Sequence, residues 1–171
     1  MSLQTLKIFA AVTLAAVAGV TISACMQGGS KQAAFETKTV PGYGLFYMDE
    51  GASAKLAYGQ ANSDNVGLML QCQKGSRQID VTDAARTMPS GTLTLASSGA
   101  QTTLKTEAQS FEGSSFVVAH APSEAAPLRA FRRSGRMDVA YAGTHYGVAA
   151  SADERAGVEL FFAACESGKA V

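Results

Sequence analysis

Hydrophobic and polar residues divide the chain into three parts. Residues 8–22 are almost all apolar or small and follow the basic residue Lys7. Residues 25–42 are polar or small and show no periodicity, which is typical of a flexible tether. From Tyr43 onward, short apolar or alternating runs are separated by turn-forming residues. The pattern therefore predicts an N-terminal apolar segment, a tether and one folded domain over residues 43–171.

Strand-like runs account for most of this domain. Residues 92–96 and 101–108 alternate between polar and apolar positions on either side of Ser97-Ser98-Gly99, which predicts a β-hairpin. Residues 66–70 form a short, continuously apolar run between turn signals. Such a run predicts a central strand that is buried on both faces.

A second hairpin is expected further along the chain. Apolar residues in 128–132 and 137–141 flank Ser134-Gly135, a pair of residues that favours a tight turn. Together, the turn signals predict about eight antiparallel strands. We expect a mainly β domain, arranged as a sandwich or a partly open barrel.

The last element has a helical pattern. Its apolar residues recur at positions i, i+3, i+4 and i+7, which is the spacing of one helical stripe: Val158, Phe161, Phe162 and Cys165. Ser151 and Glu154 have the spacing of a capping box, in which each side chain bonds the backbone amide of the other residue. The pattern predicts one C-terminal helix over residues 152–166 that packs on the β-structure.

Composition limits the function classes. The chain has 14 Lys and Arg residues and 14 Asp and Glu residues, so its formal net charge is zero. This balance argues against nucleic acid as the main partner, because nucleic-acid binding needs a basic surface. The length of 171 residues fits one domain with a substantial core.

The apolar segment ends in a recognisable motif, Ile22-Ser23-Ala24-Cys25. The apolar run is shorter than the roughly 20 residues that span a bilayer, and a short run behind a basic residue is typical of a secretory signal peptide. The motif resembles the lipobox of bacterial lipoproteins. An ordinary signal peptide with a chance cysteine, or an uncleaved membrane helix, is the alternative.

The lipobox resemblance implies a covalent membrane anchor. It implies that residues 1–24 are removed and that Cys25 receives acyl chains, including palmitate; two or more chains bind a membrane stably. Met26 follows the cysteine. In lipoproteins of this kind an Asp at that position favours retention in the inner membrane, so we expect the periplasmic side of the outer membrane.

Two further cysteines, Cys72 and Cys165, form an even pair in an oxidising compartment. The helical stripe turns Cys165 toward the core, where the strand ending at Cys72 also lies. The sequence therefore predicts a disulfide, which the chain-entropy model values at about 4–5 kcal/mol. A redox or metal-binding pair is the alternative, although neither cysteine lies in a C-x-x-C motif or beside a histidine.

The two histidines, His120 and His145, are candidates for a general base because imidazole titrates near neutral pH. A carboxylate such as Asp64 or Asp138 could orient either ring. No Gly-x-Ser-x-Gly or His-Glu-x-x-His motif accompanies them. We therefore expect no catalytic residue, metal site or cofactor, although a pocket that holds a histidine beside a serine or an aspartate would favour a hydrolase.

Four cations gather in one segment: Arg129, Arg132, Arg133 and Arg136. They are candidates for contact with an anionic surface, such as lipid headgroups, lipopolysaccharide phosphates or an acidic patch of a partner. The alternative is a solvated hairpin whose charges discourage pairing between strand edges.

These features favour a membrane-anchored, periplasm-facing lipoprotein that acts as a non-enzymatic binding or envelope-interaction module. Its expected partners are the membrane, through the lipid, and an envelope protein. One alternative is an envelope hydrolase that uses His120 or His145. The other is an inhibitor of a cell-wall lytic enzyme, since small disulfide-linked β lipoproteins of the lysozyme-inhibitor kind have a similar architecture. Ser134-Gly135 and Tyr141 echo their motif with a different spacing.

Overall fold

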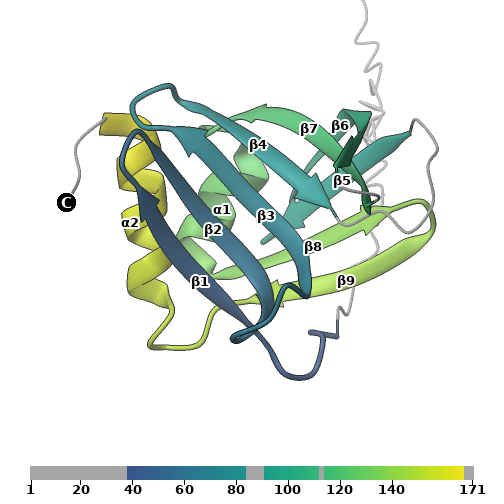
Figure 1. The fold of residues 1–171 in the computed structure, drawn as a ribbon, viewed down its shortest axis with the longest axis horizontal. Coiled ribbons are helices and arrows are strands. Elements are labelled where there is room, and N and C mark those ends of the chain that lie inside the picture. Colours follow the sequence, from purple (N-terminus) through teal and green to yellow (C-terminus); the bar gives the residue numbers. More distant parts are fainter. Residues whose placement is uncertain (1–37, 84–90, 112–113, 168–171) are drawn as a thin grey trace, which may run out of the picture. The chain divides into compact units, whose positions relative to one another are not determined.

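The computed structural model describes residues 38–83, 91–111 and 114–167. These residues form nine strands and two helices (Figure 1). The strands are β1 (Tyr43–Glu50), β2 (Ser53–Gln60), β3 (Val66–Gln73), β4 (Gln78–Asp83), β5 (Thr92–Ser97), β6 (Ala100–Phe111), β7 (Ser114–Pro122), β8 (Arg136–Tyr141) and β9 (Thr144–Ala149). The helices are α1 (Ala126–Ser134) and α2 (Arg155–Ser167). The predicted mainly β fold with a C-terminal helix is confirmed.

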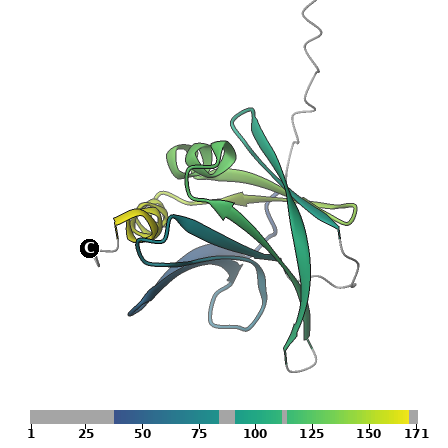
Figure 2. The same ribbon diagram turned by 90° about the horizontal axis from the view of Figure 1, so that it is seen from above.

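All nine strands belong to one antiparallel sheet in the order β1-β2-β3-β4-β7-β6-β5-β8-β9. The long strand β6 pairs with β5 through residues 100–105 and with β7 through residues 106–111. One strand thus joins two parts of the sheet, which lie at an angle to one another (Figure 2).

The two ends of the sheet approach each other just before β1. Thr39 forms a parallel bridge with Gly147 of β9, and the Gly147 amide donates to the carbonyl of Lys38 at 3.1 Å. The sheet is therefore nearly closed, like a barrel. Residues at the end of the predicted tether already take part in this closure.

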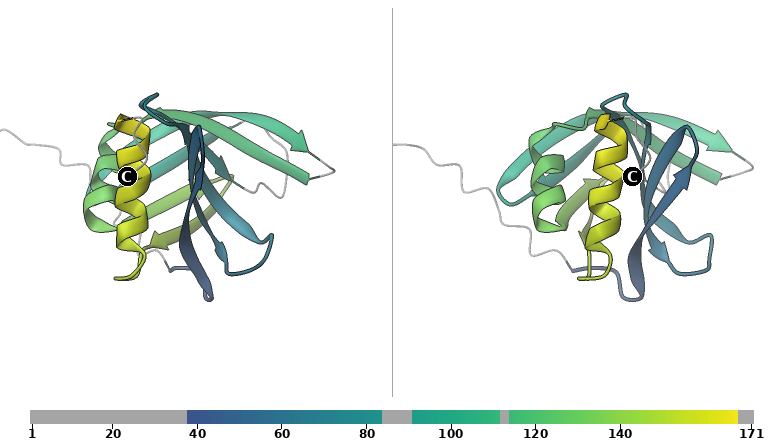
Figure 3. Two further views of the ribbon diagram at one scale, coloured as in Figure 1. Left: turned by 60° about the vertical axis from the view of Figure 1, so that its left-hand side comes forward. Right: turned by 90° about the vertical axis from the view of Figure 1, so that its left-hand side faces the viewer.

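The helices α1 and α2 lie side by side (Figure 3). Their buried side chains share one core with the inward-facing residues of the strands. The Phe162 ring packs edge-on against Phe131 of α1 at a centroid distance of 6.3 Å, and against Phe161 at 5.4 Å. Burial of three aromatic rings gives this part of the core much of its apolar area.

The helix α1 replaces the strand and hairpin expected around Ser134-Gly135, so that prediction was wrong. The buried residues Pro127, Leu128, Ala130 and Phe131 do not alternate, and their separations of three and four residues fit a helix. Pro127 in the first turn and Gly135 after the last favour the helix. Gly135 has a φ of 70°, and its amide donates to the carbonyl of Phe131 at 2.6 Å, which ends the helix.

The capping box at α2 is confirmed. The Ser151 amide donates to Oε2 of Glu154 at 2.7 Å, and the Glu154 amide donates to Oγ of Ser151 at 3.4 Å. The other carboxylate oxygen, Oε1, accepts the amide of Leu45 in β1 at 3.0 Å. The same glutamate therefore starts the helix and fastens it to an edge strand.

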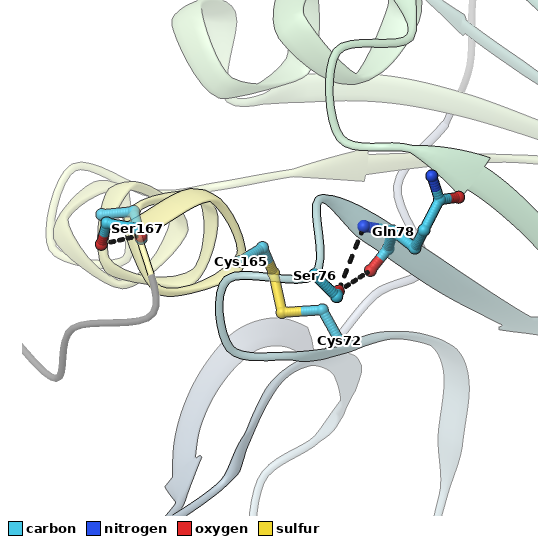
Figure 4. The surroundings of a disulfide bond; sticks show 6 residues. Cys72, Ser76, Gln78, Cys165 and Ser167 are labelled. Carbon is cyan, nitrogen blue, oxygen red and sulfur yellow. Dashed lines mark hydrogen bonds between the residues drawn. A yellow bond between two sulfur atoms is a disulfide. The ribbon is translucent and has the colours of Figure 1, made fainter.

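The disulfide between Cys72 and Cys165 is present and buried, as predicted (Figure 4). It joins the end of β3 to the last turns of α2. Beside it, the amides of Gly75 and Arg77 donate to the carbonyls of Ala164 and Cys165 at 2.9 and 3.0 Å. These bonds satisfy carbonyls that a helix end leaves without intrahelical partners.

Candidate functional site

The strand β3 has two different faces. Leu68, Leu70 and Cys72 are buried in the core, whereas Gly67, Met69 and Gln71 point to the other face and are only half-buried. The prediction that this strand is buried on both faces was therefore wrong. Among the described residues, no second layer of the fold covers its apolar outer residues, which line a groove.

The groove has a volume of about 490 Å³ and lies on the face of β3, β4 and β7 that points away from the core, with one residue from β6. Strand register arranges its walls in rows. Gln71, Asp80 and His120 form a polar row across the three strands. Met69, Thr82 and Val118 form a mostly apolar second row. Beyond this row, Gln109 of β6 lies opposite Phe116 of β7, and Val66 and Gly67 of β3 line the same end of the groove.

Asp80 and His120 form a hydrogen-bonded pair at the polar end. Nδ1 of His120 lies 2.7 Å from Oδ1 of Asp80, and the side chains are 55% and 49% exposed. An ionised carboxylate only accepts hydrogen bonds, so Nδ1 carries the proton. In the neutral ring, Nε2 is then an acceptor.

Asp80 was not singled out from the sequence. Asp64 lies in the turn between β2 and β3, and Asp138 lies in β8. The Asp80–His120 contact depends on the register between β4 and β7, which places residues 40 positions apart directly opposite each other. Alternation along β4 showed which residues share a face, but it could not show which strand lies beside them.

The groove offers few groups for catalysis. Among the described residues that line it, the only hydroxyl belongs to Thr82, which is two residues from Asp80 and thus about 7 Å away along the strand. His145 lies near the start of β9, which does not adjoin β7 in the sheet. Within the described parts of the chain, no group of three or more His, Cys, Asp or Glu residues could hold a metal ion.

The four arginines do not share one environment. Arg132 on α1 pairs with Glu159 and Glu166 of α2 at 2.7 and 2.9 Å and lies over the Phe162 ring. The hydrogen bonds that Arg132 donates to Glu159 and Glu166 raise the pKa of Arg132, and the bond to Glu159 lowers the pKa of that glutamate. Arg132 therefore joins the two helices.

The other three arginines of the cluster are exposed: Arg129, Arg133 and Arg136. The first two lie on α1 and the third begins β8. Contact with an anionic surface stays a prediction for these three residues.

A buried aspartate and a half-buried tyrosine form a polar pair where the sheet closes. The Tyr146 hydroxyl of β9 donates to Oδ2 of Asp83, at the end of β4, at 2.6 Å. Burial raises the pKa of Asp83, and this hydrogen bond partly offsets the rise. The Tyr146 ring stacks on Tyr58, whose hydroxyl accepts the amide of Val40 at 3.0 Å. The arrangement connects β2, β4, β9 and the segment before β1.

Comparison with protein-family models, with curated proteins and with solved structures gives no match. Neither described helix is long and apolar enough to cross a membrane. The groove and its Asp80–His120 pair are therefore interpreted from their own geometry.

Proposed function

We propose that this protein is a lipid-anchored binding module of the bacterial cell envelope, and that the groove on the outer face of β3, β4 and β7 holds a small ligand. One observation carries the binding role: apolar and hydrogen-bonding side chains converge in a concave site of about 490 Å³. Sites for small ligands commonly have volumes of about 300–1,000 Å³, apolar walls and a few placed polar groups.

The binding role is tested by filling the groove. Thr82 lies in its middle row, so Thr82→Trp should place an indole where the ligand binds while keeping a residue type that favours strands. Native mass spectrometry of protein from its own membranes should show a small adduct on the wild type and at least a tenfold lower occupancy on the variant.

The control for this experiment is Thr94→Trp, the same substitution on β5, where the Thr94 hydroxyl lies 3.2 Å from the exposed Thr103 hydroxyl of β6. Thr94 does not line the groove, so we expect this variant to keep the adduct. Absence of an adduct on the wild type, or equal occupancy on the wild type and Thr82→Trp, would contradict a ligand in the groove.

The anchor part of the proposal rests on the lipobox-like motif before Cys25. Residues 1–37 lie outside the described part of the structure, which begins at Lys38. A lipid on Cys25 would leave residues 26–37 as a tether, and the domain would face the periplasm. Because Met26 and not Asp follows Cys25, we propose that the anchor lies in the outer membrane. We also propose that an envelope protein is a further partner of the anchored domain.

Intact mass tests the anchor. We expect protein from native membranes to begin at Cys25 and to carry the additional mass of acyl chains, because a thioether and an amide-linked chain are covalent. Cys25→Ala should remove both the added mass and cleavage at this position. An unmodified wild-type mass, or a chain that begins elsewhere, would contradict lipidation.

A second candidate function is hydrolysis, because the groove holds a histidine hydrogen-bonded to an aspartate. In that case, His120 is a general base for a water molecule and Asp80 orients its ring. The binding role remains our first proposal, since the described lining residues supply no serine or cysteine nucleophile.

Ester hydrolysis separates these two functions. The binding proposal predicts that wild type, His120→Gln and His145→Gln hydrolyse p-nitrophenyl butyrate at equal rates. Removal of a general base typically slows a reaction by about 10²–10⁴-fold. If only His120→Gln slowed hydrolysis by that factor, the result would contradict a purely binding role and favour the hydrolase function.

A further inference from the structure

We infer that the groove is specific for a small molecule with a primary ammonium head and an apolar body about 10 Å long. The inference rests on the proposed binding function and adds the chemical class of the ligand. It is carried by the polar row of Gln71, Asp80 and His120, by the mostly apolar residues beyond that row, and by Asp80 as the one carboxylate among the described lining residues.

The polar row presents hydrogen-bond acceptors. Oδ1 of Asp80 lies 2.7 Å from Nδ1 of His120, and the carboxylate keeps further lone pairs as acceptors. Gln71 adds an amide beside Asp80 in the same row. A primary ammonium carries three donors and no acceptor, so it complements this end of the groove.

Charge selects the same head group. Asp80 is the only carboxylate, and no lysine or arginine occurs, among the described residues that line the groove. Lys55, which lies opposite Gln71 on β2, is paired with Glu50 at 2.8 Å. A phosphate, sulfate or carboxylate head would therefore meet the Asp80 carboxylate with no lysine or arginine among the described lining residues, whereas an ammonium would gain an ion pair with Asp80.

The residues beyond the polar row determine the polarity and length of the ligand's body. Met69 and Val118 lie one row from Asp80, and Phe116 lies two rows away. Residues two apart along a strand are separated by about 7 Å, so the groove extends about 13 Å from the polar row to Phe116. An aliphatic or aryl chain of about 10 Å would cover Met69 and end beside Phe116.

The volume favours a small molecule over a macromolecular partner. A space of about 490 Å³ holds a molecule of drug size. We therefore assign the groove to a small amphiphilic amine. Neutral and anionic molecules with the same apolar body are the alternative ligands that the experiment tests.

The test uses three probes with one body and three heads: 4-phenylbutylamine, 4-phenyl-1-butanol and 4-phenylbutyrate. Each is titrated into the processed, full-length protein in phosphatidylcholine nanodiscs, with methionine methyl groups labelled with ¹³C. Met69 lies in the groove, Met137 is buried in the core, and Met48 is exposed on β1. The three methyl signals separate groove binding from unfolding and from binding elsewhere.

We expect the amine to shift the Met69 signal saturably, the alcohol to bind at least tenfold more weakly, and the butyrate to leave Met69 unchanged. Asp80→Asn keeps an acceptor for His120 but removes the charge. It should weaken amine binding about tenfold, equivalent to about 1.4 kcal/mol. Asp153→Asn, the same change in the exposed turn before α2, should not affect binding.

Equal binding of the amine and the alcohol at Met69, tighter binding of the butyrate, or unchanged amine affinity in Asp80→Asn would overturn the ammonium class and leave the binding function in place. An amine that fails to shift Met69 would also overturn it. The adduct experiment with Thr82→Trp tests the binding function separately. Failure of the ammonium specificity can therefore be distinguished from failure of the binding function.

Discussion

Replacement of both Cys72 and Cys165 by alanine is expected to lower the free energy of unfolding by about 4–5 kcal/mol. The disulfide joins residues 93 positions apart, and closure of so long a loop removes many conformations from the unfolded chain. Typical domains are stable by about 5–15 kcal/mol. The loss would therefore leave a protein close to its unfolding threshold.

Urea unfolding followed by circular dichroism measures this change. Reduced wild-type protein is the matched control, because it keeps both sulfur atoms in the core but lacks the bond. We expect it to lose nearly as much stability as the double variant. A loss below about 1 kcal/mol in both samples would contradict the chain-entropy account of this cross-link.

The disulfide should also affect one region more than others. The β3–β4 turn donates two backbone hydrogen bonds to the last turns of α2, beside the disulfide. Without the covalent bond, these two hydrogen bonds and the packing of the core side chains hold that end of the helix to the turn. We expect faster hydrogen exchange at the Gly75 and Arg77 amides than in the wild type, under conditions where both proteins are folded.

The second large effect is expected for Tyr146→Phe, which should cost about 1.5–3 kcal/mol at pH values where Asp83 is ionised, the range for a hydrogen bond to a charged group. The variant keeps the ring that stacks on Tyr58 but removes the hydroxyl that donates to the buried Asp83. A buried carboxylate then loses its donor. Thermal or urea unfolding would measure the loss.

The cost should depend on pH in a defined direction. Burial raises the pKa of folded Asp83, so folded protein takes up a proton more readily than unfolded protein, and stability falls as pH rises through that pKa. The Tyr146 hydroxyl lowers the same pKa. Its removal should therefore cost most above the pKa of Asp83, and less at acid pH where the carboxyl is protonated.

Two variants distinguish the loss of the Tyr146–Asp83 hydrogen bond from a nonspecific loss of stability. Tyr43→Phe removes a tyrosine hydroxyl that donates to the exposed Asn65 at 2.7 Å, and should change stability by less than about 0.5 kcal/mol. In the Asp83→Asn background, where the acceptor is neutral, Tyr146→Phe should cost about 0.5–1.5 kcal/mol. Equal costs of Tyr146→Phe in the wild type and in Asp83→Asn, or no pH dependence, would contradict a charged hydrogen bond.

Local patterns predicted the elements whose structure depends on neighbours in the chain. The capping box of Ser151 and Glu154 forms because its two partners are only three residues apart. Strand positions followed alternation and turn residues for the same reason. The segment that became α1 is the exception: Ser134-Gly135 was interpreted as a hairpin turn, whereas Gly135 ends a helix that has Pro127 in its first turn and packs Phe131 against Phe162.

The candidate site was largely hidden from the sequence. The apolar run at residues 66–70 indicated burial, but apolar residues fit an uncovered groove as well as a second protein layer. Asp80 and His120 come from β4 and β7, which are separated in the sequence by β5 and β6. Strand order and register are set by long-range pairing, so alternation within one strand could not bring these two side chains together.

By itself, the sequence determined the mainly β class, the capped C-terminal helix and the pairing of Cys72 with Cys165, and it predicts the lipid anchor at Cys25. These depend on local periodicity, on spacing of three or four residues, or on the number of cysteines. Only the tertiary structure decided the strand order, the helix α1, the Arg132 ion pairs and the groove with Asp80 and His120. Each of these joins residues far apart in the chain, whose contact depends on how the whole sheet closes around its core.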